Sequence, residues 1–168
     1  MSTPLFDPSL ISSAVSSSLP AGYTLRPLRK NDYSAFLDVL RVLTTVGDIA
    51  EADWSDRYDW MAARSEEYFV LCITDDTDRV VAVGSLIVER KFLRHLGSVA
   101  HIEDIAVAKD QQGKKLGLKM IHALDDIAEK VGCYKAILDC SDKNQGFYEK
   151  CGYRLAGVQM VGSSSLPA

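Results

Sequence analysis

The sequence predicts a single α/β domain with a twisted, mixed and mostly antiparallel sheet and helices on both of its faces. Two β-branched and apolar runs at 68–74 and 80–89 are joined by a short polar turn, which is the pattern of an antiparallel hairpin. An apolar strand at 99–107, a periodic helix at 114–131 and a strand at 133–140 then form a crossover unit, whose strands should run parallel. The chain has 168 residues, 47% of them hydrophobic, so one domain with a sizeable core is expected.

Composition and residue spacing argue against several functional classes. The net charge of -4 gives no sign of a nucleic-acid partner. No apolar run reaches the length of a membrane span, and no Lys or Arg precedes Arg26, so we expect neither a membrane partner nor a basic targeting segment. The cysteines lack the spacing of a zinc site, so we expect no metal and a cytoplasmic protein with reduced thiols. They are Cys72, Cys133, Cys140 and Cys151.

The first elements follow from local patterns. Residues 1–21 hold seven serines and three prolines with little periodicity, and we expect them to form a flexible arm. The alternating run at 23–26 predicts a first strand, and Asn31 or Asp32 can cap the helix that follows. This helix should close at Gly47. Its expected core-facing residues are Tyr33, Phe36, Leu37, Leu40 and Leu43.

The segments on either side of the hairpin differ in character. Trp54, Tyr58 and Met61 are spaced i, i+4, i+7 and predict a second amphipathic helix over about 53–64, in which core packing is favoured over ligand stacking. After the hairpin, the linker 90–97 carries three cations and a histidine. Such a basic run is usually a solvated face, but this one lies beside the central strand.

The C-terminal half continues the crossover. The helix at 114–131 has one apolar face and ends at Gly132, and we expect the strand at 133–140 to be buried. The core face of the helix is Met120, Ile121, Leu124, Ile127 and Val131.

The chain should end with two short elements and a tail. A short helix is expected at about 143–150 and a last strand at 153–160, which closes a domain over 22–160. Residues 161–168 should form a flexible tail.

The loop between the central strand and its helix is suited to a phosphate or pyrophosphate. Gly113 and Gly117 let a ligand approach the main chain, and the N–H groups and positive dipole end of the helix favour an anion. The dinucleotide fingerprint G-x-G-x-x-G fails because position 115 is Lys, and the P-loop fails because no G-K-S/T follows. Taken alone, such a turn is more often a plain strand-to-helix connection.

The loop nevertheless resembles the acyl-CoA loop of the GNAT superfamily of N-acetyltransferases, with the pattern R/Q-x-x-G-x-G/A. Lys115 stands where that pattern has its first Gly. The matching residues are Gln112, Gly113, Lys114, Lys115, Leu116 and Gly117. The run 139–153 resembles the second GNAT signature, N-x-x-F/A-Y/L-x-K/R-x-G-F/Y. Four further blocks resemble the branch of this superfamily that acetylates glucosamine 6-phosphate: L-T-T-V-G at 43–47, E-R-K at 89–91, H-I-E-D-I-A-V at 101–107 and C-Y-K-A-I-L-D-C at 133–140.

The resemblance implies an N-acetyltransferase with the parallel crossover at the acyl-CoA site. It implies acetyl-CoA as co-substrate, a sugar phosphate as acceptor on the route to UDP-N-acetylglucosamine, and a homodimer with its sites near the interface. Two alternatives remain open: a GNAT enzyme for a different small amine or peptide amine, and a non-catalytic acyl-CoA-binding protein.

The expected chemistry is direct transfer in a ternary complex, because no cluster of Ser, Cys and His suggests a covalent intermediate. A main-chain N–H within Ile105, Ala106 and Val107 can polarise the thioester carbonyl. By resemblance Tyr148 faces the departing sulfur, although it can also be a core aromatic that anchors the short helix. Asn144 fits a contact to the cofactor arm, but N-capping explains it nearly as well.

Carboxylates in and after the central strand can serve the acceptor. Glu103 and Asp104 are strand neighbours and should point to opposite faces, unless a bulge relaxes the alternation. The resemblance assigns both to the substrate site, adds a hydroxyl from Thr44, and suggests that Asp139 fixes the amine or the sugar hydroxyls. The alternative for each carboxylate is a hydrogen bond to a helix or to a subunit interface.

The acceptor's phosphate needs cationic donors. Arg90 and Lys91 supply one set, and by resemblance Tyr134 with Lys135 reaches the substrate of the neighbouring subunit. The chain departs from its family here, because nothing after Arg154 is Lys or Arg, whereas the family usually ends its last strand with a basic residue. Either the earlier cations suffice or phosphate affinity is reduced.

Overall fold

The computed structural model describes residues 3–162, which divide into two compact units with the boundary between Leu138 and Asp139. The first unit contains a five-stranded sheet in the order β1-β2-β3-β4-β5. Its strands are β1 (Thr24–Pro27), β2 (Tyr68–Thr74), β3 (Val80–Arg90), β4 (Ser98–Val107) and β5 (Cys133–Ile137). The first three pairings are antiparallel and β4 with β5 is parallel, so the predicted α/β sheet with one crossover is confirmed.

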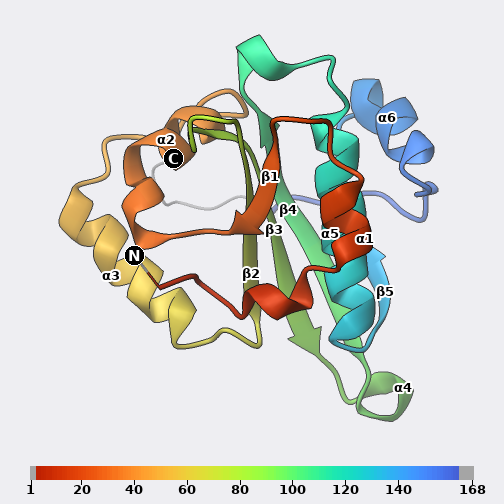
Figure 1. Ribbon diagram of the computed structural model, residues 1–168. Helices are drawn as coiled ribbons and strands as arrows, with labels where there is room; N and C mark the ends of the chain where they lie inside the picture. The colour runs from red at the N-terminus through yellow and green to blue at the C-terminus, as the bar shows by residue number, and fades with distance from the viewer. Residues whose placement is uncertain (1–2, 163–168) are drawn as a thin grey trace. The chain divides into compact units, whose positions relative to one another are not determined.

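Helices cover both faces of this sheet. In Figure 1, α2 (Tyr33–Leu40) and α3 (Glu51–Ala62) lie on one side, and α5 (Leu116–Lys130) lies on the other with α1 (Ser13–Ser17) beside it. The buried face of α5 carries four of the five predicted residues, Met120, Ile121, Leu124 and Ile127. Each such side chain stabilises the fold by about 1.5–3 kcal/mol through burial. Short 3-10 turns complete the unit: η1 (Pro8–Leu10), η2 (Lys30–Asp32) and η3 (Lys109–Gln111).

The first long helix differs from its prediction at both ends. Asp32 does not cap α2 through its side chain; its carboxylate accepts two bonds from the Arg26 guanidinium, at 2.7 and 2.9 Å, and one from the Arg29 N–H. The Asp32 carboxylate is therefore bound by the buried Arg26 and does not cap the helix. At the other end α2 stops at Leu40, and Leu43 is 50% exposed because it lies beyond the last helical turn.

The N-terminal segment is packed against the domain, where the sequence suggested a flexible arm. Leu5 and Phe6 are 2% and 3% exposed, and the Phe6 ring meets the Phe69 ring edge-on at 5.2 Å. Ser12 caps α1 by accepting a bond from the Val15 N–H at 3.2 Å. The expectation is wrong for these residues, because two adjacent apolar anchors outweigh the serine-rich composition around them.

The edge strand β5 is shorter and more open than predicted. It ends at Ile137, and both Tyr134 and Ile137 are exposed, at 44% and 37%. The prediction of a buried strand is wrong because β5 has a strand neighbour on one side only, and pairs with Ser98–His101 of β4. Before β4 the chain forms a short turn, α4 (Leu93–Leu96), in which three residues have left-handed backbone angles.

The second unit contains η4 (Asp142–Asn144) and α6 (Gln145–Lys150) within residues 139–162, which agrees with the predicted short helix. The strand predicted at 153–160 is absent from these described residues, and Leu155, Val158 and Met160 are largely exposed. An alternating sequence forms a strand only where a neighbouring edge takes up its main-chain groups, and this unit supplies none. Of the predicted tail, residues 163–168 lie outside the described part of the chain.

No helix within residues 3–162 combines the length and the apolar character that crossing a bilayer would need.

Candidate active site

A β-bulge in strand β4, which lies between β3 and the edge strand β5, is the main feature of the candidate site. Ser85 pairs with Glu103 and Val83 with Ala106, so Asp104 and Ile105 together stand opposite Gly84. Asp104 has a φ of 54°, in the left-handed region that L residues seldom adopt. Bulges of this kind re-aim side chains and are frequent beside active sites.

The bulge separates two neighbouring side chains onto opposite faces. A Cβ placed on Gly84 would lie 2.7 Å from Ile105 Cδ1 and 2.7 Å from Met120 Cγ, so this position faces α5. Ser85, the next residue along β3, therefore faces the other side, together with its partner Glu103. Glu103 thus faces away from α5, while Ile105 fills the space that Gly84 leaves.

Beyond the bulge, one edge of β4 has no strand partner within the first unit of the described chain. Pairing with β5 ends at His101 and Ile137, whereas pairing with β3 continues to Val107. The Ala108 N–H donates to the Val81 carbonyl at 2.8 Å, and because main-chain groups alternate along a strand, those of Val107 point toward the open edge. The sequence-predicted donors at 105–107 therefore lie on the stretch of β4 that β5 leaves unpaired.

The loop after β4 leads directly into the N-terminus of α5. Gly113 and Lys115 have φ angles of 81° and 62°, and Lys115 provides no side-chain cap for the helix. Gln112 Nε2 donates to the Val107 carbonyl at 3.3 Å, and Leu116 is 1% exposed, so both ends of the loop are anchored. The exposed turn and the uncapped first N–H groups fit an anion at this position.

The cations predicted to bind phosphate lie on different faces. Lys91 Nζ contacts Glu89 Oε1 at 2.5 Å, on the side of the sheet that faces away from α5. Arg90, one residue earlier, alternates to the opposite side and contacts Glu66 Oε2 at 3.5 Å. Lys135 is in register with Val99 and therefore shares the face of Lys91 and Glu103.

Tyr134 and Thr44 lie near turns. A Cβ on Gly97 would come within 2.9 Å of Tyr134 Cδ1, so the Tyr134 ring packs against the α4 turn. The Arg94 guanidinium lies 5.9 Å from the centroid of that ring. Thr44 is exposed just after α2, and its N–H donates to the Leu40 carbonyl at 3.3 Å.

Three predicted residues belong to the second unit. Asp139 accepts a hydrogen bond from Gln159 Nε2 at 3.1 Å. Asn144 precedes α6 but makes no side-chain cap, so the N-capping alternative is wrong. The Tyr148 ring lies edge-on to Phe147 and Tyr153, with centroids 5.0 and 6.4 Å apart.

Comparison with known proteins decides the family. A model of the acetyltransferase (GNAT) family matches residues 33–153. The chain belongs to this family. The Candida albicans protein named glucosamine 6-phosphate N-acetyltransferase is 49% identical over 144 residues, which cover 85% of this chain and 97% of that protein.

Solved structures agree with this GNAT assignment. The crystal structure of glucosamine-6-phosphate N-acetyltransferase from Arabidopsis thaliana has a TM-score of 0.81 and 35% identity, and covers 84% of this chain and 97% of its own. A Trypanosoma brucei acetyltransferase has a TM-score of 0.78 and 34% identity, and covers 84% and 99% of the two chains.

One residue of the GNAT loop departs from the family's sequence pattern. Lys115 occupies the position where the sequence pattern has Gly, and it adopts the left-handed conformation that Gly takes without cost. Lys115 therefore holds a left-handed position in the turn and adds an exposed cation beside it.

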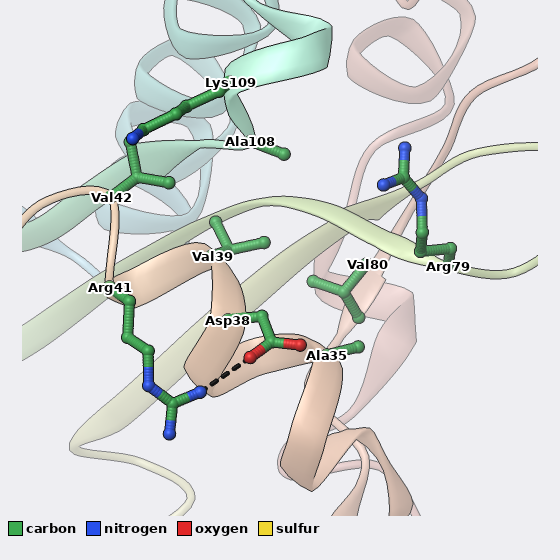
Figure 2. A pocket seen from close by; sticks show the side chains of 9 residues that line it. All are labelled: Ala35, Asp38, Val39, Arg41, Val42, Arg79, Val80, Ala108 and Lys109. Carbon is green, nitrogen blue, oxygen red and sulfur yellow. Dashed lines mark hydrogen bonds and ion pairs between the residues drawn. The ribbon is translucent and has the colours of Figure 1, made fainter. Parts of the chain in front are cut away.

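A cavity of about 400 Å³ lies next to this GNAT loop and was not expected from the sequence. It lies between α2, the start of β3 and Ala108–Lys109, which precede the loop (Figure 2). None of the predicted site residues lines it. Two arginines at its rim are paired with carboxylates, because Arg41 contacts Asp38 at 2.6 Å and Arg79 contacts Asp75 and Asp110. No local pattern signals such a cavity, because it arises from packing between distant segments.

Proposed function

We propose that this chain transfers the acetyl group of acetyl-CoA to the amine of glucosamine 6-phosphate, by direct attack in a ternary complex. The similarity to the Candida albicans protein of that name carries the proposal, because it extends over 97% of that protein. The bulged, half-open strand β4 next to an uncapped helix N-terminus supports it, since this arrangement offers donors for both a thioester and a diphosphate.

The donor side is served by the loop and by β4. Main-chain N–H groups of 112–117 hold the diphosphate of acetyl-CoA, with the Lys115 ammonium beside it. N–H groups of Ile105 and Val107 hold the carbonyl oxygen, where negative charge develops as the amine attacks. The C–S bond then breaks, and the Tyr148 hydroxyl donates a hydrogen bond to the thiolate, whose reference pKa of about 8.5 lies below that of tyrosine at about 10.

The acceptor lies on the face of Glu103. Glu103, Asp104 and Asp139 orient the amine and the sugar hydroxyls, and one carboxylate or a water takes the proton that the amine loses. Lys91 lies on that face and binds the phosphate, with Thr44 as a further contact, and Tyr134 with Lys135 reaches the acceptor of the neighbouring subunit. Arg90 alternates to the opposite side of the sheet and is left out of this contact. Lys91 directly follows β3, which pairs with the strand that carries Glu103, and this position supports phosphate binding by Lys91 next to the carboxylates.

The active form is proposed to be a cytoplasmic homodimer. Exposed apolar side chains on the α4 turn support an interface near β5: Phe92 is 94% exposed, Leu93 68% and Leu96 72%. The cysteines Cys72, Cys133, Cys140 and Cys151 are all free thiols, which supports a reducing compartment.

The test is an acceptor panel with thiol release as the readout. Glucosamine 6-phosphate should support turnover, glucosamine much less, and a lysine peptide none. Tyr148→Phe should lower kcat about a hundredfold while leaving coenzyme A binding intact. Faster turnover of the lysine peptide than of glucosamine 6-phosphate would show that the acceptor is a peptide amine. Coenzyme A binding without turnover of any amine would favour the non-catalytic alternative.

A further inference from the structure

The carboxylate of Glu89 joins two side chains on the proposed acceptor face. Its Oε1 contacts Lys91 Nζ at 2.5 Å, and its Oε2 contacts His101 Nε2 at 2.7 Å. All three side chains are partly exposed, so a ligand can reach them. Because an ionised carboxylate only accepts hydrogen bonds, His101 Nε2 carries the proton in this contact.

This cluster is held by strand register. His101 is opposite Ile87, and Glu89 is opposite Val99, so the two side chains are diagonal neighbours on one face of the β3–β4 pair. Glu103 lies two residues beyond His101 on the same face, about 7 Å along the strand. Lys135 of β5 also lies on this face, because it is in register with Val99.

The two donors favour the ionised form of Glu89. Hydrogen bonds from Lys91 first and His101 second lower the pKa of the Glu89 carboxyl. If a phosphate drew Lys91 away, Glu89 would lose one of its two partners. The movement of Lys91 to the phosphate costs more free energy if it leaves the Glu89 carboxylate without any protein donor. The cost is smaller if Glu89 still accepts the bond from His101.

We propose that His101 is a positioning residue for acceptor binding: it holds Glu89 when Lys91 turns from that carboxylate to the phosphate of the acceptor. This inference rests on the proposed function and adds a residue to it. His101 acts through Glu89 and Lys91, so it should affect binding of phosphorylated acceptors and leave the chemical step unchanged.

The test compares His101→Ala with His101→Gln, whose amide can still donate to Glu89. His101→Ala should raise KM for glucosamine 6-phosphate about two- to fivefold, because Glu89 is exposed and water replaces part of the lost bond, and kcat should stay within about twofold of the wild type. His101→Gln should restore most of that loss. His122→Ala on α5 is the matched control, because it removes the same side chain from the other side of the sheet, and its KM should match the wild type.

A second readout does not depend on turnover. Glucose 6-phosphate carries the phosphate without the amine, and calorimetry should show weaker binding to His101→Ala by the same factor. In a Glu89→Ala background, His101→Ala should weaken binding no further, because His101 acts on Lys91 only through the Glu89 carboxylate. The inference would be overturned if His101→Ala raised KM equally for glucosamine and glucosamine 6-phosphate, or lowered only kcat. It would also be overturned if His101→Gln restored nothing, or if His101→Ala had its full effect in the Glu89→Ala background. Wild-type turnover of glucosamine 6-phosphate would leave the proposed function standing in all of these cases.

Discussion

Replacing Gly84 with alanine tests whether the bulge shapes the site. Gly84 is the single residue of β3 opposite Asp104 and Ile105. An added Cβ would lie 2.7 Å from Ile105 Cδ1, 2.7 Å from Met120 Cγ and 3.1 Å from Leu124 Cδ1. All these distances are below ordinary van der Waals contact, so the side chains of β4 and α5 must move apart.

The size of the effect follows from overpacking a buried position. Gly84→Ala should lower the free energy of unfolding by about 2 kcal/mol, within the usual range of about 1–3 kcal/mol. The melting temperature should fall by about 4–8 °C. Because Ile105 carries one of the proposed main-chain donors, kcat should also fall about tenfold or more at a temperature where the variant is folded.

Urea unfolding measures the loss of stability. Two further variants show whether the loss comes from the contact between the new Cβ and Ile105. Ser85→Ala changes the neighbouring residue, whose side chain faces away from α5, and should cost less than about 0.5 kcal/mol. Ile105→Val removes the Cδ1 atom that the new Cβ would meet, so Gly84→Ala should cost less in that background. A Gly84→Ala protein as stable and active as the wild type would refute the tight contact.

Three further predictions concern other parts of the chain. Lys115→Gly should stabilise the protein by about 0.5–1 kcal/mol in urea unfolding, because glycine adopts the left-handed turn without strain; a loss of stability would contradict this. Asp32→Ala should destabilise by about 3–5 kcal/mol, because it leaves the buried Arg26 without its main partner; a loss below about 1 kcal/mol would show that water replaces the carboxylate. Burial raises the pKa of Tyr58 to about 12. Its raised pKa gives stability that is complete below about pH 10 and lost as the pH rises toward 12, so the wild type should lose about 2–3 kcal/mol relative to Tyr58→Phe across that window; parallel pH curves for the two proteins would exclude an effect of Tyr58.

Local periodicity was enough to predict the architecture. The β-branched and apolar runs joined by a polar turn predicted β2 and β3, and the 3.6-residue spacing of Met120, Ile121, Leu124 and Ile127 predicted α5 and its buried face. These patterns are local and depend little on the rest of the chain. The packing of Leu5 and Phe6 was missed because two residues contribute little to a composition dominated by serine and proline.

The sequence predicted where the candidate loop lies, but it did not predict the features that depend on strand register. Residues 112–115 form the expected turn between β4 and α5, and Leu116 and Gly117 begin the helix, because glycine spacing is readable from sequence. The bulge is not readable in that way, although a glycine within the β-branched run of β3 was a signal. The alternation of side chains along a strand would have been enough to place Arg90 and Lys91 on opposite faces of the sheet. The contact between Glu89 and His101 required knowing which residues of β3 and β4 face each other.

Hydrogen exchange with and without acetyl-CoA tests the central claim most directly, because it reports on the proposed main-chain donors themselves. Acetyl-CoA should slow amide exchange at 105–107 and 112–117. Protection confined to the cavity lined by Val42, Val80 and Lys109, with no change at 105–107 and 112–117, would contradict the account.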